Sequence, residues 1–266
     1  MRRSGAVGAA LLTLVLAGCG GAAARSDEAA ASGSAGASSG GRVSGTVDVF
    51  AAASLTDAFG EIAGLFEQQH PDAAVTLNLG GSSALAAQIV AGAPADVFAA
   101  ASPRTMQTVV DAGAASGPVV FARNALEIAV PVGNPGDVTG LPDFADAQRT
   151  IALCAPEVPC GAAAEQVLAA AGVTPAPDTL EQDVRAALAK VRLGEVDAAL
   201  VYRTDVLAAG DEVTGVPFPE AEDAVSDYPV VVLEEAPDAA AARAFVTLVL
   251  GPEGQGVLAD AGFVLP

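Results

Sequence analysis

The stretch VFAAASLTDAF, residues 49–59, joins an apolar segment to a helical pattern through three alanines and a serine. A short apolar run indicates a buried strand, and the residues after it have the periodicity of an α-helix. Ser54 stands at this junction, and its spacing from Asp57 matches a capping box, in which the hydroxyl accepts a helical N–H. The alternative is a small ligand at the helix start, where free N–H groups favour an anion.

The same alternation of strand-like and helix-like patterns continues along the chain. Helical patterns separate the short apolar runs TVDVFAAA, AVTLNL, ADVFAAA, ALEIAVPV, TIALC, DAALVY and YPVVVL. This order predicts an α/β fold whose mainly parallel sheets are flanked by helices. Ligands of such folds bind outside the carboxyl ends of the strands, so we expect a site at the turns that follow them.

Four of these turns place backbone N–H groups at the start of a predicted helix. They contain Ser54 in AAASL, Ser82 and Ser83 in GGSSAL, Cys160 in VPCG, and Asp183 and Val184 in EQDVR. Glycines in two of the turns permit a close approach of the backbone. Each turn alone is explained by a helix cap as well as by a ligand.

The composition narrows the classes of function. The chain has 266 residues, of which 52% are hydrophobic and 4% aromatic, and it has a formal net charge of −20. Nucleic-acid binding needs many Lys and Arg residues, and aromatic sugar platforms need rings that are scarce here. We therefore expect a globular protein that does not bind nucleic acid. An anionic ligand would have to be held by local neutral donors.

The first residues have the pattern of a bacterial export signal. A short basic start precedes an apolar run, and Leu16-Ala17-Gly18-Cys19 resembles the lipobox of bacterial lipoproteins. We predict a signal peptide over residues 1–19 and a lipid anchor on Cys19, the alternative being an ordinary secretory signal with an incidental cysteine. Residues 20–43 are rich in Ala, Gly and Ser, which predicts a disordered tether to the membrane.

The motifs together resemble the lipid-anchored or periplasmic molybdate-binding protein family of bacterial ABC importers. The resemblance runs from about residue 46 to residue 266, and its most specific pieces are AAASL and AGAPADVF. It implies a two-lobed, type II periplasmic-binding-protein-like fold with ALEIAVPV and YPVVVL as the two crossover strands of the hinge. Lobe 1 would hold residues 44–125 plus 230–266, and lobe 2 would hold residues 126–229.

The resemblance also implies a site in which neutral donors hold a tetrahedral oxyanion. The matching positions are the hydroxyls of Ser54 and Ser82, the backbone N–H groups of Cys160 and Val184, and the phenol of Tyr202. The family more often has VPAG where this chain has VPCG, a change that a backbone donor tolerates.

The implied function is extracytoplasmic binding of molybdate, and of tungstate, by a monomer that delivers the ion to an ABC permease without a cofactor. A receptor for sulfate or another oxyanion, a serine hydrolase using Ser54 or Ser82, and a surface interaction domain are the alternatives. His70, in EQQHP, is the one histidine, and the chain lacks a nucleophile elbow and a His/Cys cluster with zinc spacing. We therefore expect a protein that is not an enzyme.

Two further features are open to more than one interpretation. Cys154 and Cys160 flank a short loop in a chain predicted to be exported, so either a disulfide or two free thiols is expected, the disulfide being favoured. Arg185 lies beside the predicted site. It either attracts the anion or forms an ion pair with one of the many carboxylates.

Overall fold

The computed structural model describes residues 42–266. The predicted signal peptide, the lipid anchor on Cys19 and nearly all of the tether over residues 20–43 lie outside the described residues. Within residues 42–266, the helices are too short or too polar to cross a membrane.

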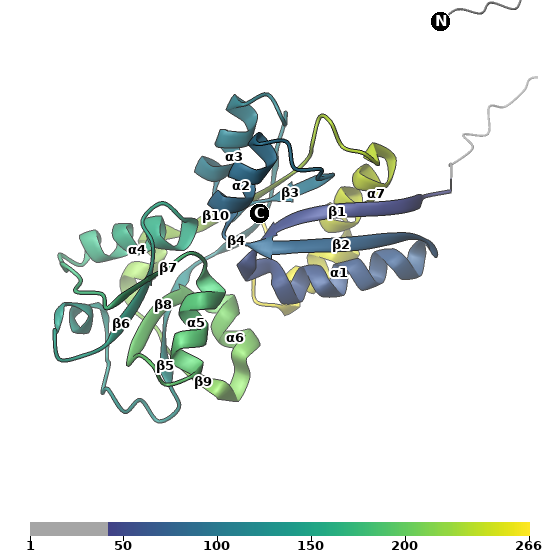
Figure 1. Ribbon diagram of the computed structural model, residues 1–266. Helices are drawn as coiled ribbons and strands as arrows, with labels where there is room; N and C mark the ends of the chain where they lie inside the picture. The colour runs from purple at the N-terminus through teal and green to yellow at the C-terminus, as the bar shows by residue number, and fades with distance from the viewer. Residues whose placement is uncertain (1–41) are drawn as a thin grey trace, which may run out of the picture. The chain divides into compact units, whose positions relative to one another are not determined.

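The first of two five-stranded sheets contains the first and the last strand of the described chain, β1 and β10 (Figure 1). Three parallel strands are followed in the sheet by β10, which is antiparallel to its neighbours β3 and β4. In spatial order the strands are β2 (Asp72–Gly80), β1 (Ser44–Ala52), β3 (Val97–Ala99), β10 (Ser226–Val232) and β4 (Val119–Asn124).

The second sheet repeats this arrangement with the middle of the chain. Three strands are parallel, and β5 is antiparallel to its neighbours β8 and β9. In spatial order the strands are β7 (Thr179–Glu181), β6 (Ile151–Cys154), β8 (Ala198–Tyr202), β5 (Leu126–Pro131) and β9 (Val213–Val216). In both sheets the single reversed strand is the one that enters from the other sheet.

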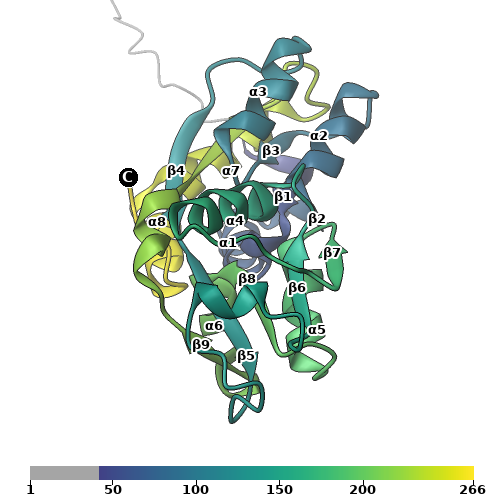
Figure 2. The same cartoon turned by 90° about the vertical axis from the view of Figure 1, so that its left-hand side faces the viewer.

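The chain crosses between the sheets twice. It passes from β4 to β5 through Ala125, and it returns between β9 and β10. Figure 2 shows the first sheet in the upper part of the view and the second in the lower part. The predicted α/β fold with mainly parallel sheets and two crossover strands is confirmed. We call the parts built on the first and second sheet lobe 1 and lobe 2; the boundaries at residues 125 and 230 stay predictions.

Helices cover both faces of the lobe 1 sheet because successive crossovers run in opposite directions along it. Val47 and Val49 of β1 pack in one core with Phe59 of the first helix, while Phe50 of the same strand packs on the other face with Leu85. The helices of lobe 1 are α1 (Thr56–Gln69), α2 (Ser82–Val90), α3 (Pro103–Asp111), α7 (Ala239–Leu250) and α8 (Pro252–Asp260).

Lobe 2 follows the same rule, and its longer helices start directly after parallel strands. They are α4 (Pro159–Ala170), α5 (Val184–Arg192) and α6 (Arg203–Ala209). Four short 3₁₀ turns complete the described chain: η1 (Ala53–Leu55), η2 (Leu141–Ala145), η3 (Gly210–Glu212) and η4 (Pro219–Ala224). In both lobes the helix N-termini thus gather at the carboxyl ends of the strands, where α/β folds bind ligands.

Candidate functional site

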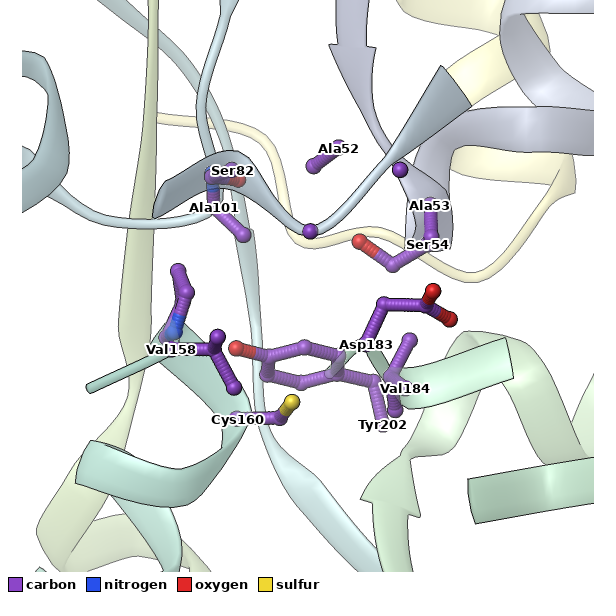
Figure 3. A pocket seen from close by; sticks show the side chains of 13 residues that line it. Ala52, Ala53, Ser54, Ser82, Ala101, Val158, Cys160, Asp183, Val184 and Tyr202 are labelled. Atoms are coloured by element: carbon purple, nitrogen blue, oxygen red, sulfur yellow. The ribbon is translucent and has the colours of Figure 1, made fainter. Parts of the chain in front are cut away.

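A small cavity lies between the two lobes at these helix N-termini. The volume open to the centre of a water-sized sphere is about 20 Å³, which is enough for one compact group. Figure 3 shows Ser54 and Ser82 on one side, and Cys160, Val184 and Tyr202 on the other. The structure therefore brings all five residues named from the sequence to one cavity.

Ser54 does not cap a helix, so the predicted capping box with Asp57 is wrong. The serine lies inside η1, and the N-cap of α1 is Leu55, which makes no side-chain capping bond. The 3₁₀ turn carries the chain past the serine before α1 starts. The Ser54 hydroxyl is buried and lies 2.9 Å from the hydroxyl of Tyr228.

Ser82 is the first residue of α2, after Gly81 as N-cap. Its Oγ accepts the N–H of Ala101 at 3.1 Å, so the hydroxyl proton stays available to the cavity. The neighbouring Ser83 instead donates to the carbonyl oxygen of Glu157 in lobe 2 at 2.7 Å. The structure thus distinguishes the two serines of GGSSAL.

Cys160 is the second residue of α4, where N–H groups have no partner within the helix. A disulfide joins it to Cys154 at the end of β6, with a Cα–Cα distance of 5.7 Å. Gly161 follows, and any side chain there would clash with the carbonyl oxygen of Ala155. The disulfide and the glycine together fix the first turn of α4 against the strand.

Val184 is the first residue of α5, so its backbone N–H also has no partner within the helix. The N-cap, Asp183, accepts the N–H of Ala186 at 2.9 Å. Among the described residues that line the cavity, Asp183 is the only charged one. The Asp183 carboxylate thus accepts a bond from its own helix, and the side-chain hydroxyls that border the cavity, those of Ser54, Ser82 and Tyr202, are neutral.

Tyr202 ends β8, and only 1% of its surface is exposed. Its hydroxyl is buried and makes no hydrogen bond of normal geometry within residues 42–266, although the side chains of Ser226 and Tyr228 lie close enough to lower its pKa. Burial raises the pKa of this phenol to about 12, so the group is a donor at neutral pH. A buried donor without a partner costs about 1–3 kcal/mol, which a ligand in the cavity would recover.

Arg185 is paired with carboxylates on both lobes, which favours the second of the two interpretations of this residue. It contacts Asp57 of lobe 1, and its Nε lies 3.3 Å from Oδ1 of Asp205 in lobe 2. Asp205 is fully buried and accepts the N–H of Tyr202 at 3.1 Å. Burial raises the pKa of Asp205 to about 7, although the neighbouring arginine acts in the opposite direction.

Tyr228 is the residue of this region that the sequence did not single out. It lies in β10, is completely buried, and bonds to a serine 174 positions away. No local motif indicates such a contact. The available hint was that the chain has only two tyrosines.

Hydrolytic and metal chemistry find little support in residues 42–266. No group of three or more His, Cys, Asp or Glu residues there could hold a metal ion. His70 follows the last turn of α1 and packs on Phe66, as expected for a residue at a helix end. Because α1 has 14 residues, His70 lies about 20 Å from Ser54 at the other end, too far to act as its base.

Comparisons with known proteins place these observations in a family. A family model described as bacterial extracellular solute-binding protein matches residues 47–264. The molybdate-binding protein ModA of Mycobacterium tuberculosis H37Rv is 39% identical over 222 residues, which are 83% of this chain and 85% of the relative.

Solved structures agree on the fold. The periplasmic molybdate-binding protein of Azotobacter vinelandii has a TM-score of 0.69 at 24% identity, covering 83% of this chain and 99% of that chain. The sulfate-binding protein SubI of Mycobacterium tuberculosis has a TM-score of 0.73 at 17% identity, covering 83% and 86%. Since both ligands occur on this fold, the fold alone does not identify the anion. By the family model and its sequence relatives, the chain belongs to the bacterial extracellular solute-binding proteins.

Proposed function

We propose that this protein binds molybdate, and also tungstate, outside the cytoplasm and delivers the ion to the permease of an ABC importer. The observation that carries the proposal is the buried hydroxyl of Tyr202, which borders the cavity and makes no hydrogen bond of normal geometry within residues 42–266. The identity with ModA relatives supports molybdate as the ion.

The donor set suits a dianion without any ionic bond. Two serine hydroxyls, two helix N-terminal N–H groups and one phenol border the cavity. Hydrogen bonds to a charged partner contribute roughly 1.5–3 kcal/mol each, so five such bonds contribute on the order of 7–15 kcal/mol. This gain can offset dehydration of the anion and ordering of the lobes. Without a buried counter-ion, opening of the lobes also allows release.

Contacts across the cleft support binding by lobe closure. Ser83 of lobe 1 bonds to the Glu157 carbonyl of lobe 2, and Arg185 reaches Asp57 from the opposite direction. Gly81 lies so close to the Gln182 carbonyl oxygen that a side chain would clash with it. A bound anion would join donors of both lobes, and the permease would recognise that joined form.

The lipid anchor on Cys19 and the monomeric state belong to the same proposal. An anchored receptor of this family would hold the ion near its permease. Mass spectrometry of the mature protein tests the anchor, because a lipidated Cys19 at the N-terminus is expected. An unmodified N-terminus at another residue would overturn it.

Calorimetric titration with molybdate, tungstate, sulfate and phosphate tests the function. We expect tight binding of molybdate and tungstate, weak binding of sulfate, which is smaller, and weak binding of phosphate, which is protonated and needs an acceptor. Ser54→Ala combined with Ser82→Ala should abolish tight binding, whereas Ser83→Ala, which removes one contact between the lobes and no donor to the ligand, should weaken binding less. Tighter binding of sulfate than of molybdate would identify sulfate as the transported ion. No binding of any of the four oxyanions would overturn the transport assignment.

A further inference from the structure

We propose that Tyr228 is a positioning residue that directs the proton of Ser54 into the cavity and thereby favours fully deprotonated oxyanions over protonated ones. The inference deepens the proposed function and rests on it. Tyr228 does not line the cavity, so it would act only through the residues that it touches.

The first step is a proton count between two hydroxyls. The oxygens of Ser54 and Tyr228 lie 2.9 Å apart, and either one is able to donate. If Ser54 donates to Tyr228, the serine turns lone pairs toward the cavity. If Tyr228 donates to Ser54, the serine has its own proton left for a ligand. An oxyanion that accepts from Ser54 therefore requires Tyr228 to be the donor.

Tyr228 is well suited to remain that donor. The residue is completely buried, and burial raises the pKa of its phenol well above the usual value of 10.0. Its ring packs at steep angles against Tyr202, Phe121 and Phe263, with centroid distances of 5.8, 6.4 and 5.4 Å. These contacts hold the ring, and with it the hydroxyl, in one place beside Ser54.

Ser82 is arranged in the same way on the same side of the cavity. Its Oγ accepts the backbone N–H of Ala101 at 3.1 Å. Both serines therefore have an acceptor position next to a buried protein donor, which leaves their protons for the ligand. The difference is that the donor to Ser54 is a side chain, so a single substitution can remove it.

The physical consequence concerns selectivity among oxyanions. A hydroxyl without a fixed donor can rotate and offer either its proton or a lone pair. A protonated anion such as phosphate needs an acceptor for its own proton, whereas molybdate needs donors only. Loss of the Tyr228 hydroxyl should thus weaken molybdate binding. It should weaken phosphate binding less, so the ratio of molybdate to phosphate affinity falls.

Tyr228→Phe tests this directly, because it keeps the ring contacts and removes one oxygen. Calorimetric titrations at pH 7 would compare the wild-type protein, Tyr228→Phe, Ser54→Ala and the double variant, each with molybdate and with phosphate. We expect Tyr228→Phe to lower molybdate affinity about tenfold and to lower the ratio of molybdate to phosphate affinity by a similar factor. In the Ser54→Ala background the same substitution should change neither quantity.

The outcomes separate the positioning role from the proposed function. Wild-type binding of molybdate with an unchanged affinity ratio in Tyr228→Phe would overturn the role of Tyr228 alone. An equal loss in the Ser54→Ala background would also overturn it, since the effect would not pass through the serine. No molybdate binding by the wild-type protein would overturn both. The titration stoichiometry reports folded protein, and a folding defect would not change the affinity ratio.

Discussion

The two lobes supply the site with donors of different kinds. Lobe 1 uses the side-chain hydroxyls of Ser54, which is hydrogen-bonded to the Tyr228 hydroxyl, and of Ser82, which accepts the N–H of Ala101. Lobe 2 uses the backbone N–H groups of Cys160 and Val184, with the Tyr202 phenol beside them. Residue type therefore determines the lobe 1 half, whereas helix position determines most of the lobe 2 half. Substitutions should break the two halves in different ways.

The largest effect is expected where the halves meet. Gly81→Ala places a methyl group against the carbonyl oxygen of Gln182 in the other lobe, so the lobes cannot approach. We expect molybdate affinity to fall by about 100-fold, because a displacement of the donors by about 1 Å is enough for a loss of this size. The unliganded protein should stay folded. Calorimetry measures the affinity.

The adjacent glycine provides the matched control for this experiment. A methyl group at Gly80 would meet only the flexible side chain of Leu85, at 3.9 Å. Gly80→Ala should bind molybdate nearly as well as the wild-type protein. Equal losses in the two variants would contradict the view that closure depends on the contact between Gly81 and Gln182.

The lobe 1 half should be sensitive to the identity of one serine. Ser82→Ala removes a ligand donor and leaves the buried N–H of Ala101 without its partner. We expect about a tenfold or greater loss of affinity and about 1–3 kcal/mol lower stability, measured by calorimetry and by denaturant unfolding. Ser83→Ala should change both quantities less, since that hydroxyl bonds to Glu157. A larger loss of molybdate affinity in Ser83→Ala than in Ser82→Ala would mean that Ser83, and not Ser82, is the donor to the ligand.

The lobe 2 half should depend on what fixes the first turn of α4. Replacing both Cys154 and Cys160 by serine keeps the backbone N–H but removes the disulfide. We expect a loss of stability of about 2 kcal/mol, because the closed loop is short, and a few-fold loss of affinity. Thermal unfolding with and without molybdate measures both. Unchanged values would mean that the close approach of Gly161 to the Ala155 carbonyl suffices to hold the turn.

The smallest effect on the site is expected from Asp205, which acts only through Arg185 and the Tyr202 N–H. Burial raises the pKa of Asp205 to about 7, above the unfolded value of about 3.9, against the effect of Arg185. Its protonated form therefore contributes stability that is complete below about pH 4 and is lost as the pH rises through 7.

Unfolding of the wild-type protein and of Asp205→Asn between pH 4 and 8 measures this contribution. The wild-type protein should lose stability relative to the variant as the pH increases, with Asp57 and Asp183 acting in the same direction as burial on the Asp205 pKa. A difference that is constant over this range would show that Asp205 stays ionised beside Arg185.

Much of this arrangement could be predicted from the sequence, because it depends on repeated local patterns. Apolar runs followed by helices indicated the α/β sheets, and the turn motifs pointed to Ser54, Ser82, Cys160 and Val184, whereas Tyr202 was named only through the family resemblance. The start of α5 after Asp183 was also expected from its cap. Three strands escaped notice. β7 has only three residues, and β4 and β9 are edge strands with partly exposed residues.

The contacts that join distant parts of the chain could not be predicted in this way. The spacing of Ser54 and Asp57 suggested a local cap, yet the serine bonds to Tyr228 and the aspartate to Arg185. Both partners come from segments more than 100 positions away, which no local pattern reports. The close approach of Gly81 to Gln182 is of the same kind.

The most direct test of the account is the substitution Tyr202→Phe, studied by molybdate titration and by unfolding of the unliganded protein. The hydroxyl has no partner within residues 42–266, so its removal should not lower the stability of the unliganded protein. Its loss should lower molybdate affinity by about 10- to 100-fold, the effect of one hydrogen bond to a charged ligand. Unchanged affinity would contradict the claim that this hydroxyl is reserved for the anion. If the stability also fell, the hydroxyl would serve the fold and not the ligand.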